Sequence, residues 1–445
     1  MATAADLDGW SPDASQHFVF SGYRWNGDSG ELCLDYELDG RAFTERFVFP
    51  LPDEPQPGPA LDRALTLLHW VAGVSYWKAA CPQNVSFVGN APSAAQADWL
   101  NELYREGLAE FAWHNRLPAE RFAVFRGPPS PAAVVESAGL EGAALVPMGG
   151  GKDSLVAWAR LKRQGLNPHT VQVGSSKLIS AVATRAGSPH WVIERRLDPG
   201  LGELNVRGAL NGHVPITAIN AAALIVLAVL HGFKRVVFAN ERSADEATLF
   251  DAQGRPVNHQ FAKSLRFERM LDHWVRTSIA SDLEVFSLLR RDRELAVCRE
   301  FASLTQFHDV FSSCNRNFHL TGPQTERWCG RCPKCHFVFL GLAPFMDRAA
   351  LVGIFGADLL ACSELLPGFR ALLALDGRKP FECVGEAAEA RAAIRFLAGR
   401  PEWRDHVIVR TLDEALAGLA VPALEDLCRP GGDHLIPERL RHASA

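Results

Sequence analysis

Ala144-Leu145-Val146-Pro147-Met148-Gly149-Gly150-Gly151-Lys152-Asp153-Ser154 is the stretch of this sequence that decides the fold. Residues 144–148 have the apolar composition of a buried strand, and residues 153–163 have the pattern of a helix that stops at Gly165. Three consecutive glycines join the two. A glycine-rich turn between a strand and a helix lets the backbone approach an anion, and several N–H groups and the helix N-terminus then face that anion. We therefore expect this loop to hold a triphosphate.

The residues of the loop suggest individual roles in binding a nucleotide. Backbone N–H groups would surround the phosphates, the ammonium of Lys152 can neutralise a phosphate, and the hydroxyl of Ser154 can donate to one. Asp153 can hold Mg²⁺ or cap the helix. A glycine turn that binds no ligand is the alternative. The predicted nucleotide-binding residues of the loop are Gly149, Gly150, Gly151, Lys152, Asp153 and Ser154.

Two familiar phosphate loops do not fit this stretch. A Walker A loop requires glycine where Val146 stands and serine or threonine where Asp153 stands. A dinucleotide fingerprint requires a glycine at position 154, which is a serine. The loop instead resembles the Ser-Gly-Gly-x-Asp-Ser loop of the PP-loop ATP pyrophosphatases, with Gly149 in place of the first serine. That resemblance implies an adenine nucleotide alpha hydrolase-like fold, in which ATP is cleaved at the α phosphate and pyrophosphate leaves.

Strands and helices alternate in the sequence downstream of the loop. Apolar runs at 170–173, 190–193, 236–238 and 283–289 are typical of strands, and helical patterns lie at 178–186, 216–230 and 261–277. This alternation predicts an α/β fold with a parallel sheet and right-handed crossovers. The apolar run at 216–230 is short for a membrane span, so we expect a buried helix and no membrane association.

The residues before the loop have a different pattern. Residues 18–49 alternate in polarity, with turn residues at Asn26-Gly27-Asp28 and Asp39-Gly40, and predict an antiparallel meander. Helices are expected at 61–80 and 94–107. The proline-rich stretch 127–131 predicts a linker, although a surface loop inside one domain is the alternative. The expected organisation is an α+β N-terminal domain at 1–126, the ATP-binding α/β domain at 140–346 and a helical region at 347–445.

Composition excludes several classes of protein. With a formal net charge of −5, 47% hydrophobic and 22% charged residues, the chain resembles an ordinary globular enzyme. An acidic balance argues against a large nucleic-acid surface, so no nucleic-acid partner is expected. The first eight residues lack the basic and apolar regions of a signal peptide, which favours a cytoplasmic protein.

Four of the ten cysteines lie in a pattern that chelates metal. Their spacing is C-x14-C-x2-C-x2-C, in which two adjacent C-x2-C steps form a tight turn and a distant cysteine completes a tetrahedron. We expect a structural Zn²⁺ and a helix at 337–346 directly after it. An iron–sulfur cluster, unligated thiols, or a thiol that acts as a base are the alternatives. The four predicted ligands are Cys314, Cys329, Cys332 and Cys335.

Two resemblances extend this interpretation beyond single motifs. Residues 143–346 resemble the 7-cyano-7-deazaguanine synthases, which are PP-loop enzymes with a similar cysteine tetrad and also begin by adenylating a carboxylate. A second resemblance is carried by Phe18-Val19-Phe20-Ser21-Gly22-Tyr23-Arg24, residues 148–154, Gly212-His213-Val214-Pro215 and Cys329-Gly330-Arg331-Cys332-Pro333-Lys334-Cys335. Through these stretches, most of the chain resembles the ATP-dependent UDP-N-acetylmuramoyl-L-alanyl-L-glutamate epimerases, the MurL family.

The second resemblance implies an enzyme that inverts the terminal L-Glu of a nucleotide-sugar peptide in peptidoglycan precursor synthesis. It implies ATP and Mg²⁺ as cofactors, with Asp153 among the catalytic residues. For the acid or base we nominate His213, although a structural histidine is the alternative. Asn240 and Asp245 follow the end of a predicted strand and are expected to contact the nucleotide or its metal, although a solvated loop is the alternative. Glu241, His259 and Lys263 are further candidates in the same region.

Other functions remain compatible with the sequence. A PP-loop ligase or synthase would let an amine or sulfur donor attack the adenylate, and a PP-loop tRNA thiolase would act on nucleic acid. The acidic composition argues against the thiolase. A regulator that binds a nucleotide without hydrolysing it belongs to another class altogether. Pyrophosphate release in the presence of candidate substrates would separate these functions.

Overall fold

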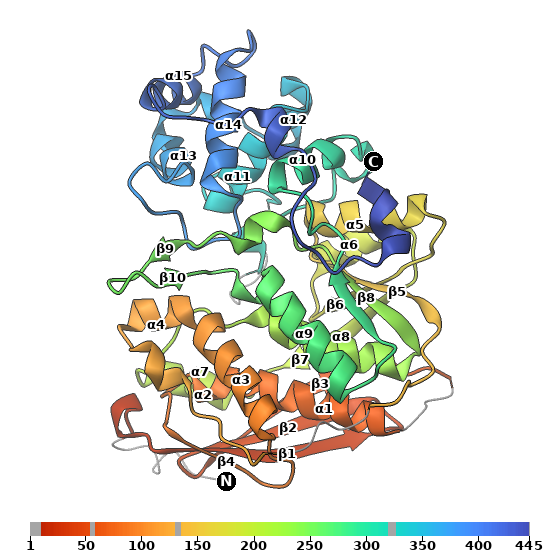
Figure 1. The fold of residues 1–445 in the computed structure, drawn as a ribbon. Coiled ribbons are helices and arrows are strands. Elements are labelled where there is room, and N and C mark those ends of the chain that lie inside the picture. Colours follow the sequence, from red (N-terminus) through yellow and green to blue (C-terminus); the bar gives the residue numbers. More distant parts are fainter. Residues whose placement is uncertain (1–9, 54–57, 130–134, 319–325, 445) are drawn as a thin grey trace.

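The structure is a computed structural model that describes residues 10–53, 58–129, 135–318 and 326–444. The N-terminal residues 1–8 and residues 130 and 131 of the expected linker lie outside this range. Figure 1 shows a large sheet in the middle of the molecule, the N-terminal meander at one end and the C-terminal helices at the other.

A nine-stranded sheet forms the centre of the fold, in the order β11-β8-β5-β6-β7-β3-β2-β1-β4. Strands β7, β6, β5, β8 and β11 are parallel to one another, as the alternating pattern predicted. The strands are β1 (His17–Asn26), β2 (Glu31–Leu38), β3 (Arg41–Val48), β4 (Asn84–Phe87), β5 (Gly142–Pro147), β6 (His169–Val173), β7 (His190–Arg196), β8 (Phe233–Phe238) and β11 (Glu284–Ser287).

The parallel strands are apolar on both faces because helices cover both faces. Leu145 and Val236 belong to a core that contains α1, α8 and α9, whereas the neighbouring Val146 and Val237 belong to a second core that contains α5, α6 and α10. Alternate residues of each strand therefore reach opposite layers. These helices are α1 (Pro59–Ala72), α5 (Lys152–Arg163), α6 (Lys177–Ala186), α8 (Ile216–Leu230), α9 (Leu265–Ser278) and α10 (Glu294–Ala302).

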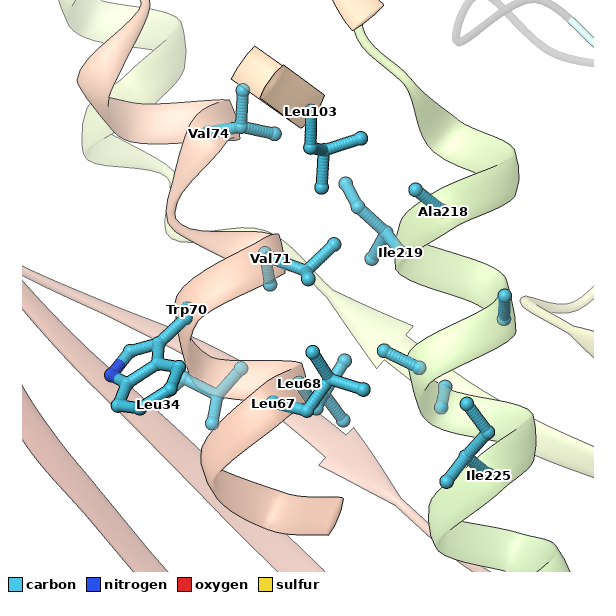
Figure 2. Close-up of a cluster of buried hydrophobic side chains, with 14 of the residues drawn as sticks. Leu34, Leu67, Leu68, Trp70, Val71, Val74, Leu103, Ala218, Ile219 and Ile225 are labelled. Carbon is cyan, nitrogen blue, oxygen red and sulfur yellow. The ribbon is translucent and has the colours of Figure 1, made fainter. Parts of the chain in front are cut away.

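Helix α8 is the apolar segment that could have been mistaken for a membrane span. Figure 2 shows it beside α1, with Ile219 and Ile225 of α8 near Leu68 and Val71 of α1. The side chains of α8 from Ala221 to Leu230 are all buried. The expected buried helix is confirmed. Among the described residues, none of the helices has the length and apolarity needed to cross a membrane.

The N-terminal meander is continuous with the parallel sheet. Its last strand, β3, is antiparallel to β7 from Arg46–Arg196 to Val48–Glu194. At this junction Glu45 is fully buried, and its carboxylate accepts a hydrogen bond from Nε of Arg195 at 2.6 Å. The predicted division into domains stays a prediction, but strands from both sides of the 126/140 boundary share one sheet.

Turn residues close the meander as expected. Asp39 and Gly40 both have positive φ, which is the conformation of a two-residue hairpin turn, and the side chain of Asn26 accepts hydrogen bonds from the N–H groups of Asp28 and Ser29. Three further helices accompany the meander, and a two-stranded hairpin projects beyond the large sheet. These are α2 (Val74–Trp77), α3 (Ala94–Gly107), α4 (Ala109–Asn115), β9 (Leu249–Phe250) and β10 (Pro256–Val257).

Several helix boundaries differ from the predicted ones for local reasons. The helix expected at 61–80 is divided at Gly73, whose missing side chain makes room for the ring of Phe20. The helix expected at 261–277 begins at Leu265, because the hydroxyl of Ser264 accepts a hydrogen bond from the Phe267 N–H and caps it. Helix α11 (Pro333–Leu342) begins inside the cysteine motif, with proline in its first turn.

Helices follow α11 in the described residues up to 444, in agreement with the helical region predicted at 347–445. They pack on the core that contains α5 and α10. In Figure 1 they form the blue end of the molecule. The helices are α12 (Arg348–Phe355), α13 (Leu366–Leu372), α14 (Ala387–Ala398), α15 (Val407–Ala415) and α16 (Leu424–Leu427), and α7 (Gly200–Val206) lies earlier, after β7.

Candidate functional site

A cavity of about 500 Å³ lies at the carboxyl ends of β5 and β8. These two strands are neighbours in the sheet, and the helix after β5 and the helix before β8 lie on opposite faces. This arrangement is the topological switch point of an open parallel sheet, where ligands bind in such folds. The lining includes Gly149 and Gly151 after β5, and Asn240 and Glu241 after β8.

The glycine loop has the conformation that its sequence suggests. Gly150 has a φ of +78°, and its carbonyl accepts a hydrogen bond from the Ser312 N–H at 3.0 Å. A side chain on Gly151 would come within 2.5 Å of the Ser313 hydroxyl, so the Ser313 side chain would have to move to make room for it. The hydroxyl of Ser154 donates to the Gly151 carbonyl at 3.2 Å. Gly151 precedes α5 and has no side chain that could cap the helix. The N-terminus of α5, with its partial positive charge, is therefore open toward the cavity.

Lys152 does not belong to the lining of the cavity. Its ammonium is buried and forms ion pairs with the carboxylates of Asp153 and Glu294. Burial alone would lower the pKa of Lys152, but these two carboxylates more than compensate and raise it well above its ordinary value. Lys263 and Lys334 line the cavity instead. The predicted phosphate contact of Lys152 stays a prediction.

Three carboxylates gather beneath the loop. Donor oxygens of Asp153, Glu241 and Glu294 all lie within 4.8 Å of one another. Burial, followed by the negative charge of Asp153, raises the pKa of Glu241 and raises that of Glu294 to about 7. Like charges at this spacing favour a bound cation, and carboxylate oxygens are the ligands that Mg²⁺ prefers. These residues can therefore hold a divalent ion next to the glycine loop.

A second group of titratable side chains forms another part of the cavity wall. Nδ1 of His259 contacts the carboxylate of Glu110, and Nδ1 of His213 lies 3.8 Å from the same carboxylate. The two imidazole rings are 4.4 Å apart between centroids. Burial lowers the pKa of His213 to about 4. Burial also acts to lower the pKa of His259, but hydrogen bonds to Cys383 and Glu110 raise it to about 9.

Cys383 completes this part of the wall. The ammonium of Lys263 donates to its sulfur at 3.3 Å, and His259 forms a hydrogen bond with it. Burial raises the pKa of this thiol, but Lys263 and His259 outweigh that effect and lower the pKa to about 5. The two neighbouring cationic side chains therefore favour the thiolate form of Cys383.

The cysteine tetrad has the dimensions of a metal site. The sulfur of Cys332 lies 3.5 Å from that of Cys335 and 4.0 Å from that of Cys314, and the sulfurs of Cys329 and Cys335 are 3.8 Å apart. A tetrahedron with metal–sulfur distances of about 2.3 Å has edges of about 3.8 Å, whereas a disulfide would be about 2.05 Å. All four thiols are free of disulfides. The donor set thus fits Zn²⁺.

The structure brings most of the predicted site residues to the cavity. His213, Asn240, Asp153 and Ser154 line it. Asp245 is absent from the lining: its carboxylate accepts a hydrogen bond from the Leu265 N–H at 2.7 Å, which fixes the start of α9. Its expected nucleotide contact stays a prediction.

Sequence reasoning missed four residues of the site: Glu110, Glu294, Lys334 and Cys383. Lys334 lies inside the cysteine motif, and that position could have drawn attention to it. Glu294 follows the fifth parallel strand, which is a further signal, because strand ends of such a sheet meet at one edge. Neither Glu110 nor Cys383 has a local signal, because distant segments bring them to the site.

The fold and the site define a mostly parallel α/β protein that has a glycine-rich loop and a cavity lined by titratable residues at the switch point of its sheet. Comparison with known protein families identifies the family to which this α/β protein belongs. The model of the MurL N-terminal domain matches residues 10–288, and that of the MurL C-terminal domain matches residues 310–426. The chain belongs to the MurL family.

Three relatives cover most of this chain and carry one name, UDP-N-acetyl-alpha-D-muramoyl-L-alanyl-L-glutamate epimerase. A protein of Xanthomonas oryzae pv. oryzae is 44% identical over 86% of this chain and 85% of its own length. A Micromonospora protein is 42% identical over 94% of this chain and 96% of its own. A Salinispora tropica protein is 40% identical over 96% and 95%.

Proposed function

We propose that the protein is an ATP-dependent epimerase that inverts the terminal L-Glu of UDP-N-acetylmuramoyl-L-Ala-L-Glu to D-Glu through an adenylated carboxylate. The name carried by its relatives supports the epimerisation and the substrate. The main observation in support of the mechanism is that the glycine loop and the titratable side chains His213, His259 and Cys383 line one cavity. The substrate belongs to the cytoplasmic stage of peptidoglycan synthesis, so we expect a cytoplasmic enzyme.

Adenylation explains why an epimerase would use ATP. The α-proton beside a free carboxylate is very weakly acidic, since its removal would place a second negative charge next to the first. The nitrogen of this Glu is held in a peptide bond, so it is unable to form a Schiff base with pyridoxal phosphate. A mixed anhydride of the carboxylate with AMP removes the negative charge of the carboxylate and turns its carbonyl into an electron sink. A base can then take the α-proton, and an acid can return one on the other face.

The residues around the cavity divide into two functional groups under this proposal. Backbone N–H groups at Gly149 to Gly151 and the Ser154 hydroxyl would bind the phosphates, with Lys263 and Lys334 supplying positive charge. His213 is the nominated acid or base. The substrate carboxylate attacks the α phosphate, pyrophosphate leaves, and hydrolysis of the inverted adenylate later releases AMP.

Metal ions have two separate places in this scheme. Asp153, Glu241 and Glu294 would hold Mg²⁺, which supplies positive charge to the phosphates of bound ATP. A Zn²⁺ would bind the cysteine tetrad (Cys314, Cys329, Cys332 and Cys335), where all ligands are protein thiolates and none of the four positions is left for a substrate. We therefore assign it a structural role.

Analysis of the nucleotide products tests the ATP chemistry. With the dipeptide precursor and Mg²⁺, the protein should convert ATP to AMP and pyrophosphate, since the substrate attacks the α phosphate. A kinase-type reaction would give ADP instead. Detection of ADP as the main product would refute the adenylate mechanism.

Reaction in D₂O tests the inversion. The D-Glu product should carry deuterium at its α-carbon, because a base that exchanges its proton with solvent returns deuterium. A precursor whose terminal α-carboxylate is amidated serves as the control and should not react, since it has no carboxylate to adenylate. Pyrophosphate release without formation of D-Glu would refute the epimerase and leave an adenylating enzyme.

A further inference from the structure

The carboxyl-terminal part of the chain contributes a thiolate to the cavity that the proposed function has not yet used. Cys383 lines the cavity and lies in the irregular segment between α13 and α14. Its neighbours are the ammonium of Lys263, at 3.3 Å from the sulfur, and the imidazole of His259. Lys334 and Glu382 are the other charged groups of the lining that act on it.

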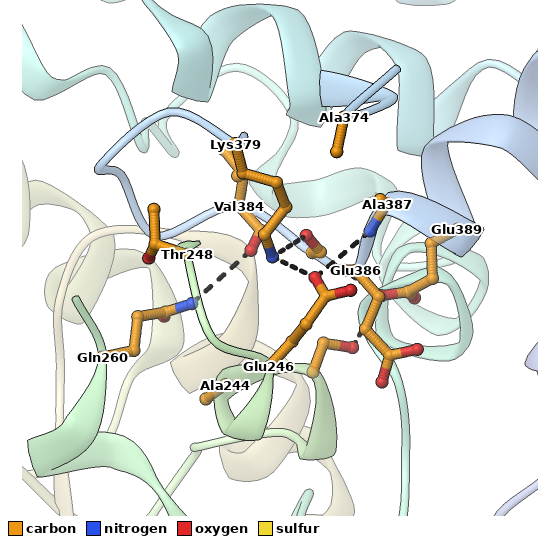
Figure 3. A network of polar contacts seen from close by, with 12 residues as sticks. Ala244, Glu246, Thr248, Gln260, Ala374, Lys379, Val384, Glu386, Ala387 and Glu389 are labelled. Atoms are coloured by element: carbon orange, nitrogen blue, oxygen red, sulfur yellow. Dashed lines mark hydrogen bonds and ion pairs between the residues drawn. The ribbon is translucent and has the colours of Figure 1, made fainter. Parts of the chain in front are cut away.

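Contacts on both sides of Cys383 fix its segment against the rest of the site. Lys379, four residues before it, forms an ion pair with Glu246 and donates to the Gly385 carbonyl at 3.1 Å. The carboxylate of Glu246 also accepts a hydrogen bond from the Ala387 N–H, as Figure 3 shows. The side-chain amide of Gln260 donates to the Val384 carbonyl at 3.5 Å.

This network has a consequence for the position of the sulfur. Gln260 is adjacent in sequence to His259, and Glu246 lies on the chain that leaves β8 toward the β9–β10 hairpin. The buried ammonium of Lys379 neutralises Glu246, and both ends of the segment are thereby bonded to the residues that follow β8. The thiolate is held at the cavity wall and does not depend on a free loop for its placement.

We propose that Cys383 is a catalytic base of the epimerisation, taking the α-proton of the adenylated glutamate. This inference rests on the proposed function and adds to it the identity of a proton acceptor. The C–H bond at the α-carbon breaks, an S–H bond forms, and the electron pair moves into the carbonyl oxygen of the adenylate. A proton that comes from water to the opposite face of the α-carbon completes the inversion. The thiol then returns its proton to water.

Charge conservation favours the thiolate over the neighbouring histidines. Proton transfer to Cys383 moves one negative charge from sulfur to the enolate oxygen, and the cationic Lys263 and His259 that held the thiolate can stabilise the enolate instead. The same transfer to the neutral ring of His213 would create a new pair of charges in a partly buried site. His259 already carries a proton beside Glu110 and has no lone pair free to accept another.

Two variants of Cys383 separate the proton transfer from adenylation. Both Cys383→Ala and Cys383→Ser should still release AMP and pyrophosphate with the dipeptide precursor, because the adenylate forms and hydrolyses without inversion. Formation of D-Glu and incorporation of deuterium at the α-carbon should fall at least about 100-fold, which is the usual contribution of a general base. Cys362→Ser is the matched control: this cysteine is also partly exposed but lies outside the cavity lining, and the variant should keep both activities.

The outcomes distinguish this inference from the proposed function. D-Glu formation near the wild-type rate in Cys383→Ala would overturn the role of Cys383 while the epimerase remains. Loss of ATP cleavage together with inversion in both variants would also overturn it, since the thiolate would then support the pocket rather than the proton transfer. If the wild-type protein forms no D-Glu, the proposed function itself fails.

Alkylation of the wild-type protein gives an independent measurement. At neutral pH iodoacetamide should label Cys383 faster than Cys362, because thiolates and not thiols react. Peptide mapping by mass spectrometry measures the two rates in one sample. Slower labelling of Cys383 than of Cys362 would contradict a thiolate at the cavity wall.

Discussion

Replacement of Glu45 by alanine should destabilise the protein strongly, although Glu45 does not belong to the lining of the cavity. Its carboxylate is fully buried at the junction of β3 and β7, and its partner Arg195 has a side chain that is 13% exposed. Removal of one member of a buried ion pair usually costs about 3–5 kcal/mol, because the other charge is left without compensation. Arg195 keeps a contact of 3.4 Å to the Ser75 hydroxyl and lies over the ring of Phe47. We therefore expect the lower end, about 3 kcal/mol.

Urea unfolding followed by circular dichroism measures this loss. The neighbouring Arg196 provides a matched control on the same strand, because its pair with Glu194 is exposed at 74% and 49%. Arg196→Ala should change the free energy of unfolding by less than about 0.5 kcal/mol. A double variant, Glu45→Leu with Arg195→Met, should recover most of the loss, since apolar side chains of similar volume can replace a buried pair. A Glu45→Ala protein as stable as the Arg196→Ala protein would refute the reasoning.

Four further predictions concern the cavity, the metal site and the core. Asp153→Asn should remove most of the pyrophosphate release while the protein stays folded, because Lys152 keeps its ion pair with Glu294; unchanged turnover would show that the loop does not bind ATP. Cys332→Ser should lower the zinc content below one ion per chain and lower the unfolding temperature, and elemental analysis that finds no zinc in the wild type would contradict the site. Epimerisation should fall below about pH 5, where the Cys383 thiolate is protonated, and above about pH 9, where His259 loses its proton. If the rate does not change across one of these limits, the corresponding residue has no part in the proton transfer. Ile219→Ala should lower the free energy of unfolding in urea by about 2–5 kcal/mol, because it opens a cavity between α8 and α1. A loss below about 1 kcal/mol would mean that these helices are not tightly packed.

Local patterns predicted the elements that position the site. The strand and the helix on either side of the glycine loop, the buried helix α8 and the hairpin turn at Asp39-Gly40 were all predictable, because each depends on neighbouring residues. The cysteine tetrad was equally visible, since ligand spacing in the sequence limits the geometry around a metal. The predicted site residues His213 and Asn240 reached the cavity because both lie next to helix or strand ends at the same edge of the sheet.

Long-range contacts account for what the sequence did not predict. The pairing of β3 with β7 has no local signal, since an edge strand of a meander looks the same whether or not another strand joins it. Cys383 reaches the cavity through the ion pair of Lys379 with Glu246, which are remote from each other in the chain. The sequence likewise did not predict the ion pair between the ammonium of Lys152 and Glu294, because Glu294 lies on a helix that is far away in sequence.

The junction of β3 and β7 also constrains how the chain can fold as it is synthesised. Glu45 and Arg195 are 150 residues apart, so at 5–20 residues per second the ribosome needs about 8–30 s to deliver the partner of β3. During that interval the completed meander has an unpaired edge, which is the kind of surface that joins other chains into aggregates. Arg41, Glu45 and Arg46 place three charges on this edge strand. Charges of this kind discourage pairing between nascent chains, and Glu45 is neutralised only when Arg195 arrives with β7.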